Sequence, residues 1–249
     1  MKLYKTKKNC GKLLLGILAF CTGMILLTGC GSSSEQKQNK NEETAEENKE
    51  EDKVQIGLTV DSFVIERWIR DRDVFVATAR ELGAEVNVQD AGADVKEQIS
   101  QIEYFINKQV DVIVVIARDC GALSDAIQKA QSAGIPVISY DRMVNNANTD
   151  LYISFDNRKV GEIMAQALVN ALPQGGDIFM IQGSSSDNNV QMVKQGVDDM
   201  LADTDLHVVY EANCDGWTAE LAVGYVEEAL EKYPHVKGIM CGNDDIASQ

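Results

Sequence analysis

Five consecutive β-branched residues, VIVVI at positions 112–116, decide the fold class of this 249-residue chain. An uninterrupted run of this kind is typical of a strand that is buried on both faces of a parallel sheet. Such a strand needs covering helices, and apolar residues recur at helical spacing over 95–108 before the run and over 123–133 after it. The stretch therefore predicts a central strand in an α/β sheet.

The order of strand followed by helix extends in both directions from this run. Short β-branched or alternating runs predict strands, and apolar positions three and four residues apart predict the helices between them. A repeated βαβ order predicts a parallel sheet with helices on both faces. The expected strands are 54–60, 85–89, 112–116 and 136–140, and the expected helices are 67–82, 95–108 and 123–133.

A polar segment at 141–150 breaks this alternation, which then restarts. We therefore predict an α/β fold of two doubly wound parallel-sheet lobes, the first at 54–144 and the second at 151–249, joined by a hinge at 145–150. The strands expected in the second lobe are 151–155, 177–181, 207–212 and 236–241, and the helices are 158–172, 190–201 and 218–232.

The last expected strand runs into Gly242-Asn243-Asp244-Asp245, which is a good signal for the start of a helix. Only four residues follow, and they form about one helical turn, which is too short for a stable helix. We therefore expect the second lobe to be incomplete, with its C-terminal part missing.

The first thirty residues have the organisation of an export signal. A basic segment to Lys12 and an apolar segment over 13–27 are followed by Leu27-Thr28-Gly29-Cys30, so a signal peptide is expected at 1–29. The last four residues resemble the lipobox of bacterial lipoproteins, which implies lipidation of Cys30. An ordinary cleaved signal or an uncleaved anchor is the alternative. Residues 30–53 then comprise the lipidated cysteine and an acidic, disordered tether, and the chain lies outside the cytoplasm, anchored to the cell membrane.

Composition excludes several classes of function. A net charge of −16 argues against a nucleic-acid partner, because phosphate contacts need clustered Lys and Arg. Two histidines leave little room for histidine-based catalysis or a multi-histidine metal site. Neither a GxGxxG or Walker-type phosphate loop nor a GxSxG elbow occurs. We expect no catalytic residues, no cofactor and no metal.

Three cysteines remain beyond the leader and the lipidation site, namely Cys120, Cys214 and Cys241. An odd number in an exported protein favours free thiols over a disulfide framework. Cys214 and Cys241 both fall at the ends of expected strands, so a bond between them stays open.

Asp or Asn follows nearly every expected strand. Each of these residues alone is explained as a helix cap or a turn residue. Together they lie at the carboxyl ends of parallel strands, where ligands of such sheets bind. Donors and acceptors side by side suit a neutral ligand with many hydroxyl groups. Trp68 and Trp217 each follow a strand end, so we expect them to stack on a sugar ring, with core packing as the alternative.

Several motifs carry a specific resemblance. They are Glu66-Arg67-Trp68, Tyr140-Asp141-Arg142-Met143, the segment 152–157, Asp187-Asn188-Asn189, Asp215-Gly216-Trp217 and Asn243-Asp244. These stretches resemble the periplasmic sugar-binding proteins of type I fold, and look most like the branch that binds D-xylose for ABC transporters. That family continues beyond this length with further strands, a Gln-Asp pair and a later Lys.

The resemblance implies that two lobes close on one pyranose, most similar to xylose, and deliver it to an ABC permease. The implied sugar-binding residues are Arg67, Trp68, Asp141, Arg142, Asn189, Trp217, Asn243 and Asp244. The protein is expected to be a monomer. A module that presents the sugar to a membrane kinase or chemoreceptor is the alternative, and an enzyme acting on sugars is a third reading.

Overall fold

The computed structural model describes residues 53–249. The expected signal peptide, Cys30 and all but the last residue of the expected tether lie outside this range. Within 53–249, none of the helices combines the length and the apolar character needed to cross a membrane.

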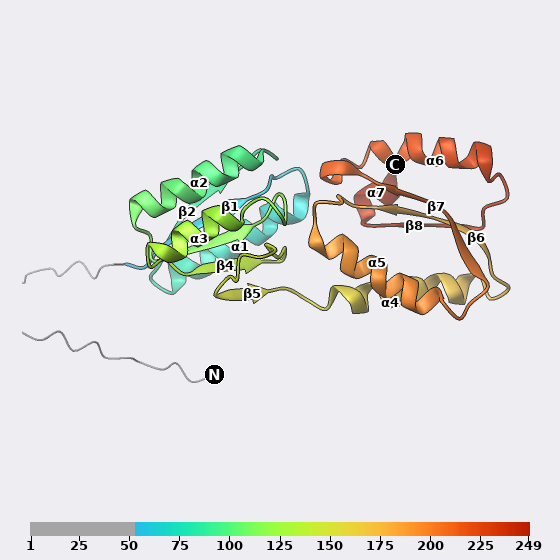
Figure 1. Ribbon diagram of the computed structural model, residues 1–249, viewed down its shortest axis with the longest axis horizontal. Helices are drawn as coiled ribbons and strands as arrows, with labels where there is room; N and C mark the ends of the chain where they lie inside the picture. The colour runs from blue at the N-terminus through green and yellow to red at the C-terminus, as the bar shows by residue number, and fades with distance from the viewer. Residues whose placement is uncertain (1–52) are drawn as a thin grey trace, which may run out of the picture. The chain divides into compact units, whose positions relative to one another are not determined.

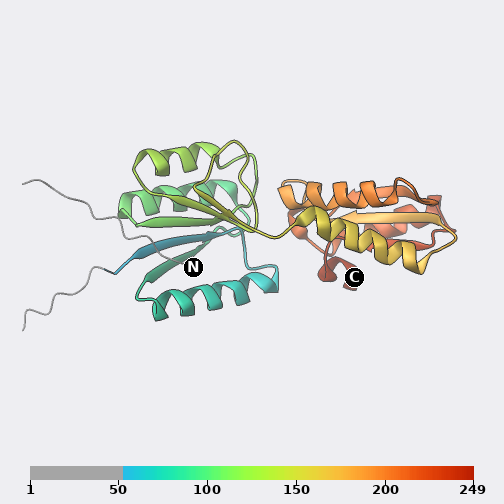
Figure 2. The same cartoon turned by 90° about the horizontal axis from the view of Figure 1, so that it is seen from below.

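The first lobe is a parallel five-stranded sheet in the order β2-β1-β3-β4-β5, with helices on both faces (Figures 1 and 2). The VIVVI run forms β3, whose last four residues are buried, so the predicted strand is confirmed. Helix α1 covers one face, and α2 and α3 cover the other, where they enclose a buried apolar cluster. The elements are β1 (Gln55–Val60), α1 (Glu66–Glu81), β2 (Glu85–Asp90), α2 (Val95–Lys108), β3 (Val112–Ile116), α3 (Ser124–Ser132), β4 (Val137–Tyr140) and β5 (Leu151–Ile153).

The second lobe is a parallel three-stranded sheet in the order β7-β6-β8. Helices α4 and α5 cover one face, while α6 and the short α7 cover the other (Figure 1). Both lobes therefore have the predicted α/β architecture. The elements are α4 (Asn157–Ala171), β6 (Gly176–Gln182), α5 (Asn188–Leu201), β7 (Leu206–Asn213), the 3-10 turn η1 (Asp215–Trp217), α6 (Leu221–Lys232), β8 (Gly238–Cys241) and α7 (Asp244–Ser248).

Strand β5 corrects the predicted boundary between the lobes. It pairs in parallel with β4, with Ile138 opposite Leu151 and Tyr140 opposite Ile153. The chain therefore leaves the first sheet only after Ile153, so a second lobe beginning at 151 and a hinge at 145–150 are wrong. The polar segment 141–150 is a crossover loop without a helix that returns the chain to the edge of the same sheet. Strand β5 lies at that edge, with Leu151 and Ile153 exposed.

Helices α4 and α5 approach each other so closely that two glycines are required. A Cβ atom at Gly161 would lie 2.0 Å from the carbonyl oxygen of Val193, and one at Gly196 would lie 1.9 Å from that of Arg158. These distances are far inside van der Waals contact, so the two backbones pack directly against each other. The contact lies in the first turns of α4 and in the middle of α5, and the N-terminal ends of the two helices are joined where the side-chain amide of Asn157 donates to Oδ1 of Asn189 at 3.1 Å.

The three cysteines of the described residues are free thiols, as predicted. Cys241 lies in β8 opposite Ile181 of β6, while Cys214 follows β7 and its N–H donates to the carbonyl of Gln182 on the other side of β6. Two strand spacings separate the cysteine Cα atoms by about 10 Å, whereas a disulfide needs less than about 7 Å. The pairing of Cys214 with Cys241 is therefore excluded by the sheet order.

Candidate functional site

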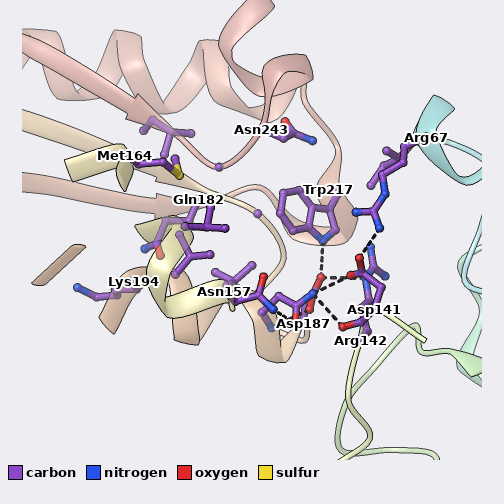
Figure 3. Close-up of a pocket in the computed structure, with 18 of the residues that line it drawn as sticks. Arg67, Asp141, Arg142, Asn157, Met164, Gln182, Asp187, Lys194, Trp217 and Asn243 are labelled. Atoms are coloured by element: carbon purple, nitrogen blue, oxygen red, sulfur yellow. Dashed lines mark hydrogen bonds and ion pairs between the residues drawn. The ribbon is translucent and has the colours of Figure 1, made fainter. Parts of the chain in front are cut away.

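A cavity of about 240 Å³ lies at the carboxyl ends of strands from both sheets (Figure 3). This is the location expected from the polar strand ends. The residues that line it come from β6, β8, the helices α1, α4 and α5, the η1 turn, and the loops that follow strands, including the loop after β4. Seven of the eight predicted site residues are among them: Arg67, Trp68, Asp141, Arg142, Asn189, Trp217 and Asn243.

The eighth, Asp244, does not line the cavity. It is exposed in the first turn of α7. Its neighbour Asn243 caps α7, because its side-chain oxygen accepts a 2.8 Å bond from the N–H of Ile246. Asn243 thus serves as both helix cap and cavity wall, while Asp244 belongs to the helix alone.

Arg142 is the buried centre of the polar wall. Its Nη1 donates to Asp61 at 2.6 Å and to the carbonyl of Ala117 at 3.1 Å. Its Nε lies 2.8 Å from the carboxylate of Asp187, which comes from the second lobe. All three charged side chains are 3% exposed. One guanidinium therefore holds together the ends of strands from two different sheets.

The carboxylate of Asp187 interacts with three other residues. One carboxylate oxygen caps α5 by accepting from the N–H of Asn189 at 2.9 Å. The other contacts Arg142 and accepts a 3.2 Å bond from the indole Nε1 of Trp217. Burial raises the pKa of Asp187 above its ordinary value, and the positive charge of Arg142 opposes that shift. Arg142 therefore favours the ionised form of Asp187.

Asp141 and Arg67 form the second ion pair of the wall. The Nη2 of Arg67 donates to Asp141, and its Nε lies 3.4 Å from Asp71. The other oxygen of Asp141 accepts a 2.8 Å bond from the side-chain amide of Asn189. Asp141 therefore also contacts both lobes. The side chain of Arg67 stays 43% exposed, so its guanidinium remains accessible from the cavity.

The two tryptophans differ in their surroundings. Trp68 is only 2% exposed and packs with Leu58 and Val60 in the apolar cluster beneath the first sheet, so the core-packing alternative holds for most of its surface. The guanidinium of Arg67 lies over its ring at 4.4 Å. Trp217, at the end of η1, is half-buried and lines the cavity. Of the two, Trp217 presents more of its ring to a ligand.

Residues 56–249 match the family model of the periplasmic binding protein domain. The chain belongs to this family. The D-xylose-binding periplasmic proteins of Haemophilus influenzae and Escherichia coli are each 42% identical to it over 199 residues, which make up 78% of this chain and 60% of theirs. The chain thus spans about three fifths of the length of these curated relatives.

Solved structures agree with the fold of this periplasmic binding protein. An ABC transporter solute binding protein from Clostridium phytofermentans, with bound β-D-glucose, matches with a TM-score of 0.73 and 26% sequence identity. The match covers 78% of this chain and 66% of that one. The expected family and its two-lobed α/β fold are therefore confirmed. Periplasmic sugar-binding proteins are binding components rather than enzymes, which agrees with the expected absence of catalysis.

Sequence reasoning missed several residues that line the cavity of this periplasmic binding protein. Asp187 belongs to one of the motifs of the resemblance but is not among the expected sugar-binding residues, although its carboxylate joins Arg142 to Trp217. Phe155 was assigned to a strand, yet it is 54% exposed and its ring lies 5.8 Å from the guanidinium of Arg67. Apolar side chains of the second lobe also line the cavity. Their periodicity in the sequence indicated only that they belong to the hydrophobic core: Val160, Met164, Met180, Ile181, Val190, Val193 and Met240.

The side chains that line the cavity are suited to binding a small ligand. Its polar wall offers guanidinium donors, carboxylate acceptors and amides, next to an indole ring and apolar side chains. Among residues 53–249, no group of three or more His, Cys, Asp or Glu side chains is arranged to hold a metal ion. Such a surface suits a small neutral molecule that has both hydroxyl groups and an apolar face.

Proposed function

We propose that this periplasmic binding protein captures a single pyranose sugar, D-xylose, in the cavity and delivers it to an ABC permease. The observation that carries the proposal is the convergence of seven motif residues, from Arg67 to Asn243 in the sequence, on one cavity. Carboxylates and guanidinium groups can bind adjacent hydroxyls, because one accepts and the other donates. The 42% identity to D-xylose-binding proteins supports this sugar in particular.

In the proposed binding mode, the sugar contacts both polar side chains and an aromatic side chain of the cavity wall. Arg67 donates to hydroxyl groups from the first lobe, and Asn243 does so with its amide from the second. The indole of Trp217 contacts the C–H face of the sugar ring. Because Asp61 and Asp187 already hold Arg142 in place, little side-chain entropy is lost when the sugar binds.

Calorimetric titration with xylose, ribose, arabinose, glucose and galactose tests the proposal. Xylose is expected to bind most tightly, since a site built around hydroxyl groups strongly rejects a sugar that leaves one of its buried polar groups unpaired. Tighter binding of another sugar would correct the choice of ligand. No heat with any of the five would overturn the proposed sugar site.

Trp217→Ala is expected to weaken xylose binding by about 1–3 kcal/mol, because a half-buried aromatic contact with the ligand is lost. The measurement is calorimetric titration of the variant beside the parent protein. Tyr104→Ala is a matched control, since Tyr104 is an exposed aromatic residue on α2 that does not line the cavity. Equal affinities for parent and Trp217→Ala would assign Trp217 a purely structural role.

We further propose that Cys30 carries the lipid that anchors the protein outside the cytoplasm. A diacylglycerol thioether supplies two acyl chains, and two chains are enough for stable anchoring. Cys30→Ala is expected to abolish labelling by radioactive palmitate and to leave the precursor uncleaved. Cys120→Ala, which removes a buried thiol of the first lobe, is the control and should label normally. Acylation of the Cys30→Ala protein would contradict the lipoprotein assignment.

A further inference from the structure

The position of Trp217 depends on a residue with no side chain. The outer edge of its indole, atoms Cη2, Cζ2 and Cζ3, lies against the backbone of Gly183, directly after β6. A Cβ atom at position 183 would lie 2.3–2.4 Å from these three atoms. Non-bonded carbon atoms prefer about 3.5–4.0 Å, so the indole occupies the space that any side chain at 183 would need.

The indole nitrogen is fixed as well. The Nε1 atom donates to Asp187 at 3.2 Å, and Asp187 is held in turn by Arg142 at 2.8 Å (Figure 3). The ring is thus held at two points, by a backbone on one edge and a hydrogen bond at its nitrogen. Together they determine both the depth and the tilt of the indole in the cavity wall.

The backbone around Trp217 is also specialised. Gly216 and Trp217 both have φ at 62°, a left-handed conformation that is uncommon for a bulky residue and tends to occur at functional sites. The end of β7, which leads into the η1 turn, is bonded to Gly183, because the side-chain amide of Asn213 donates to the carbonyl of Gly183 at 2.9 Å. Gly183 therefore contacts the indole directly, and its carbonyl is also bonded to the strand that leads into the η1 turn.

We propose that Gly183 is a positioning residue of the sugar site: its lack of a side chain lets Trp217 sit deep enough for its ring to form the wall against one face of the pyranose. The inference rests on the proposed function for its ligand, but not for the packing of the indole. A methyl group at 183 would push the ring toward the cavity and narrow it. Gly183 has no positive φ, so the backbone itself accepts alanine and the effect is transmitted through Trp217.

The test compares Gly183→Ala with Gly224→Ala in the full chain labelled with 5-fluorotryptophan. Gly224 lies on α6 and has nothing within 4 Å of its would-be Cβ atom, so it is a matched control. The chain has two tryptophans, so two ¹⁹F signals are expected, and Trp217→Phe assigns them. Without sugar, the Trp217 signal should move in Gly183→Ala and stay in place in Gly224→Ala.

Xylose titration supplies the second readout. Gly183→Ala should bind at least about tenfold more weakly than the parent, since one added methyl group in a closed pocket changes affinity by roughly 10–200-fold. Gly224→Ala should bind as the parent does. In a Trp217→Phe background, the Gly183→Ala change should cost little, because the smaller ring leaves room for the methyl group. If Gly183→Ala alone fails to fold, the test can still be made in the Trp217→Phe background.

The outcomes separate the two proposals. An unmoved Trp217 signal in Gly183→Ala, or a moved signal with unchanged xylose affinity, would overturn the role of Gly183. So would a tenfold loss caused by Gly183→Ala in the Trp217→Phe background. A moved signal in a protein whose parent binds none of the five sugars would support the positioning of Trp217 by Gly183 and overturn the proposed function instead.

Discussion

Replacing Arg142 with methionine is expected to abolish xylose binding and to lower the free energy of unfolding by about 3–5 kcal/mol. The guanidinium lies between Asp61 and Asp187, and all three side chains are 3% exposed. Methionine fills similar space but leaves Asp187 buried without a cation, and it leaves Asp61 with Arg118 alone, whose Nε lies 3.6 Å away. The loss of this buried pairing is far costlier than the loss of an exposed pair. Urea unfolding and calorimetric titration measure the two effects.

Two further variants help to interpret the loss of stability and of xylose binding expected for Arg142→Met. Arg158→Met removes an ion pair with Asp199 in which both side chains are about half exposed, and should cost no more than about 1 kcal/mol. Arg142→Lys keeps the charge but loses the planar fork that reaches both carboxylates, so it should weaken xylose binding. If Arg142→Met were as stable as Arg158→Met, the buried network would not stabilise the fold.

Gly196→Ala is expected to lower the free energy of unfolding by about 3 kcal/mol, the upper end of the usual cost of overpacking. A Cβ atom there would lie 1.9 Å from the carbonyl oxygen of Arg158, so α4 and α5 must move apart. Xylose affinity should fall too, since the N-terminal ends of these helices supply Asn157 and Asn189 to the cavity. Thermal and urea unfolding measure the stability change.

The direction of the change in the free energy of unfolding tests this prediction. Alanine is favoured over glycine inside a helix by about 1 kcal/mol, so Gly224→Ala on the open side of α6 should stabilise the protein. Gly196→Ala makes the same chemical change in α5 and should act in the opposite direction. A stabilising effect at both positions would show that the helices do not depend on the glycine contact.

The elements of the fold were largely predictable because they depend on local patterns. The helix expected at 95–108 and the strand expected at 112–116 have the bounds found in the structure. Sheet membership was less predictable, because it depends on pairing between segments far apart in the chain. The strand at 151 was recognised, but nothing in its residues showed that it returns to β4 rather than beginning a new sheet.

The candidate site was predictable to the extent that its residues sit in recognisable motifs. Asp187 shows where that reasoning ends: an aspartate before a helix is well explained as a cap, and it does cap α5. Its second oxygen, which joins Arg142 and Trp217, has no separate signal in the sequence. Contact of the seven cavity residues with sugar stays a prediction. The position of Gly183 against an indole is visible only in three dimensions.

Strand β5 bears on how the protein behaves at high concentration. Within residues 53–249 it ends the first sheet with only three residues, is paired on one side by β4, and exposes Leu151 and Ile153. An open apolar edge of this kind invites another chain to add a strand, and shortness is one of the ways natural sheets limit such pairing. A net charge of −16 gives a second safeguard, since two copies approaching each other repel before their edges meet. Colloidal stability should therefore decline as salt screens that charge or as the pH approaches 4.5.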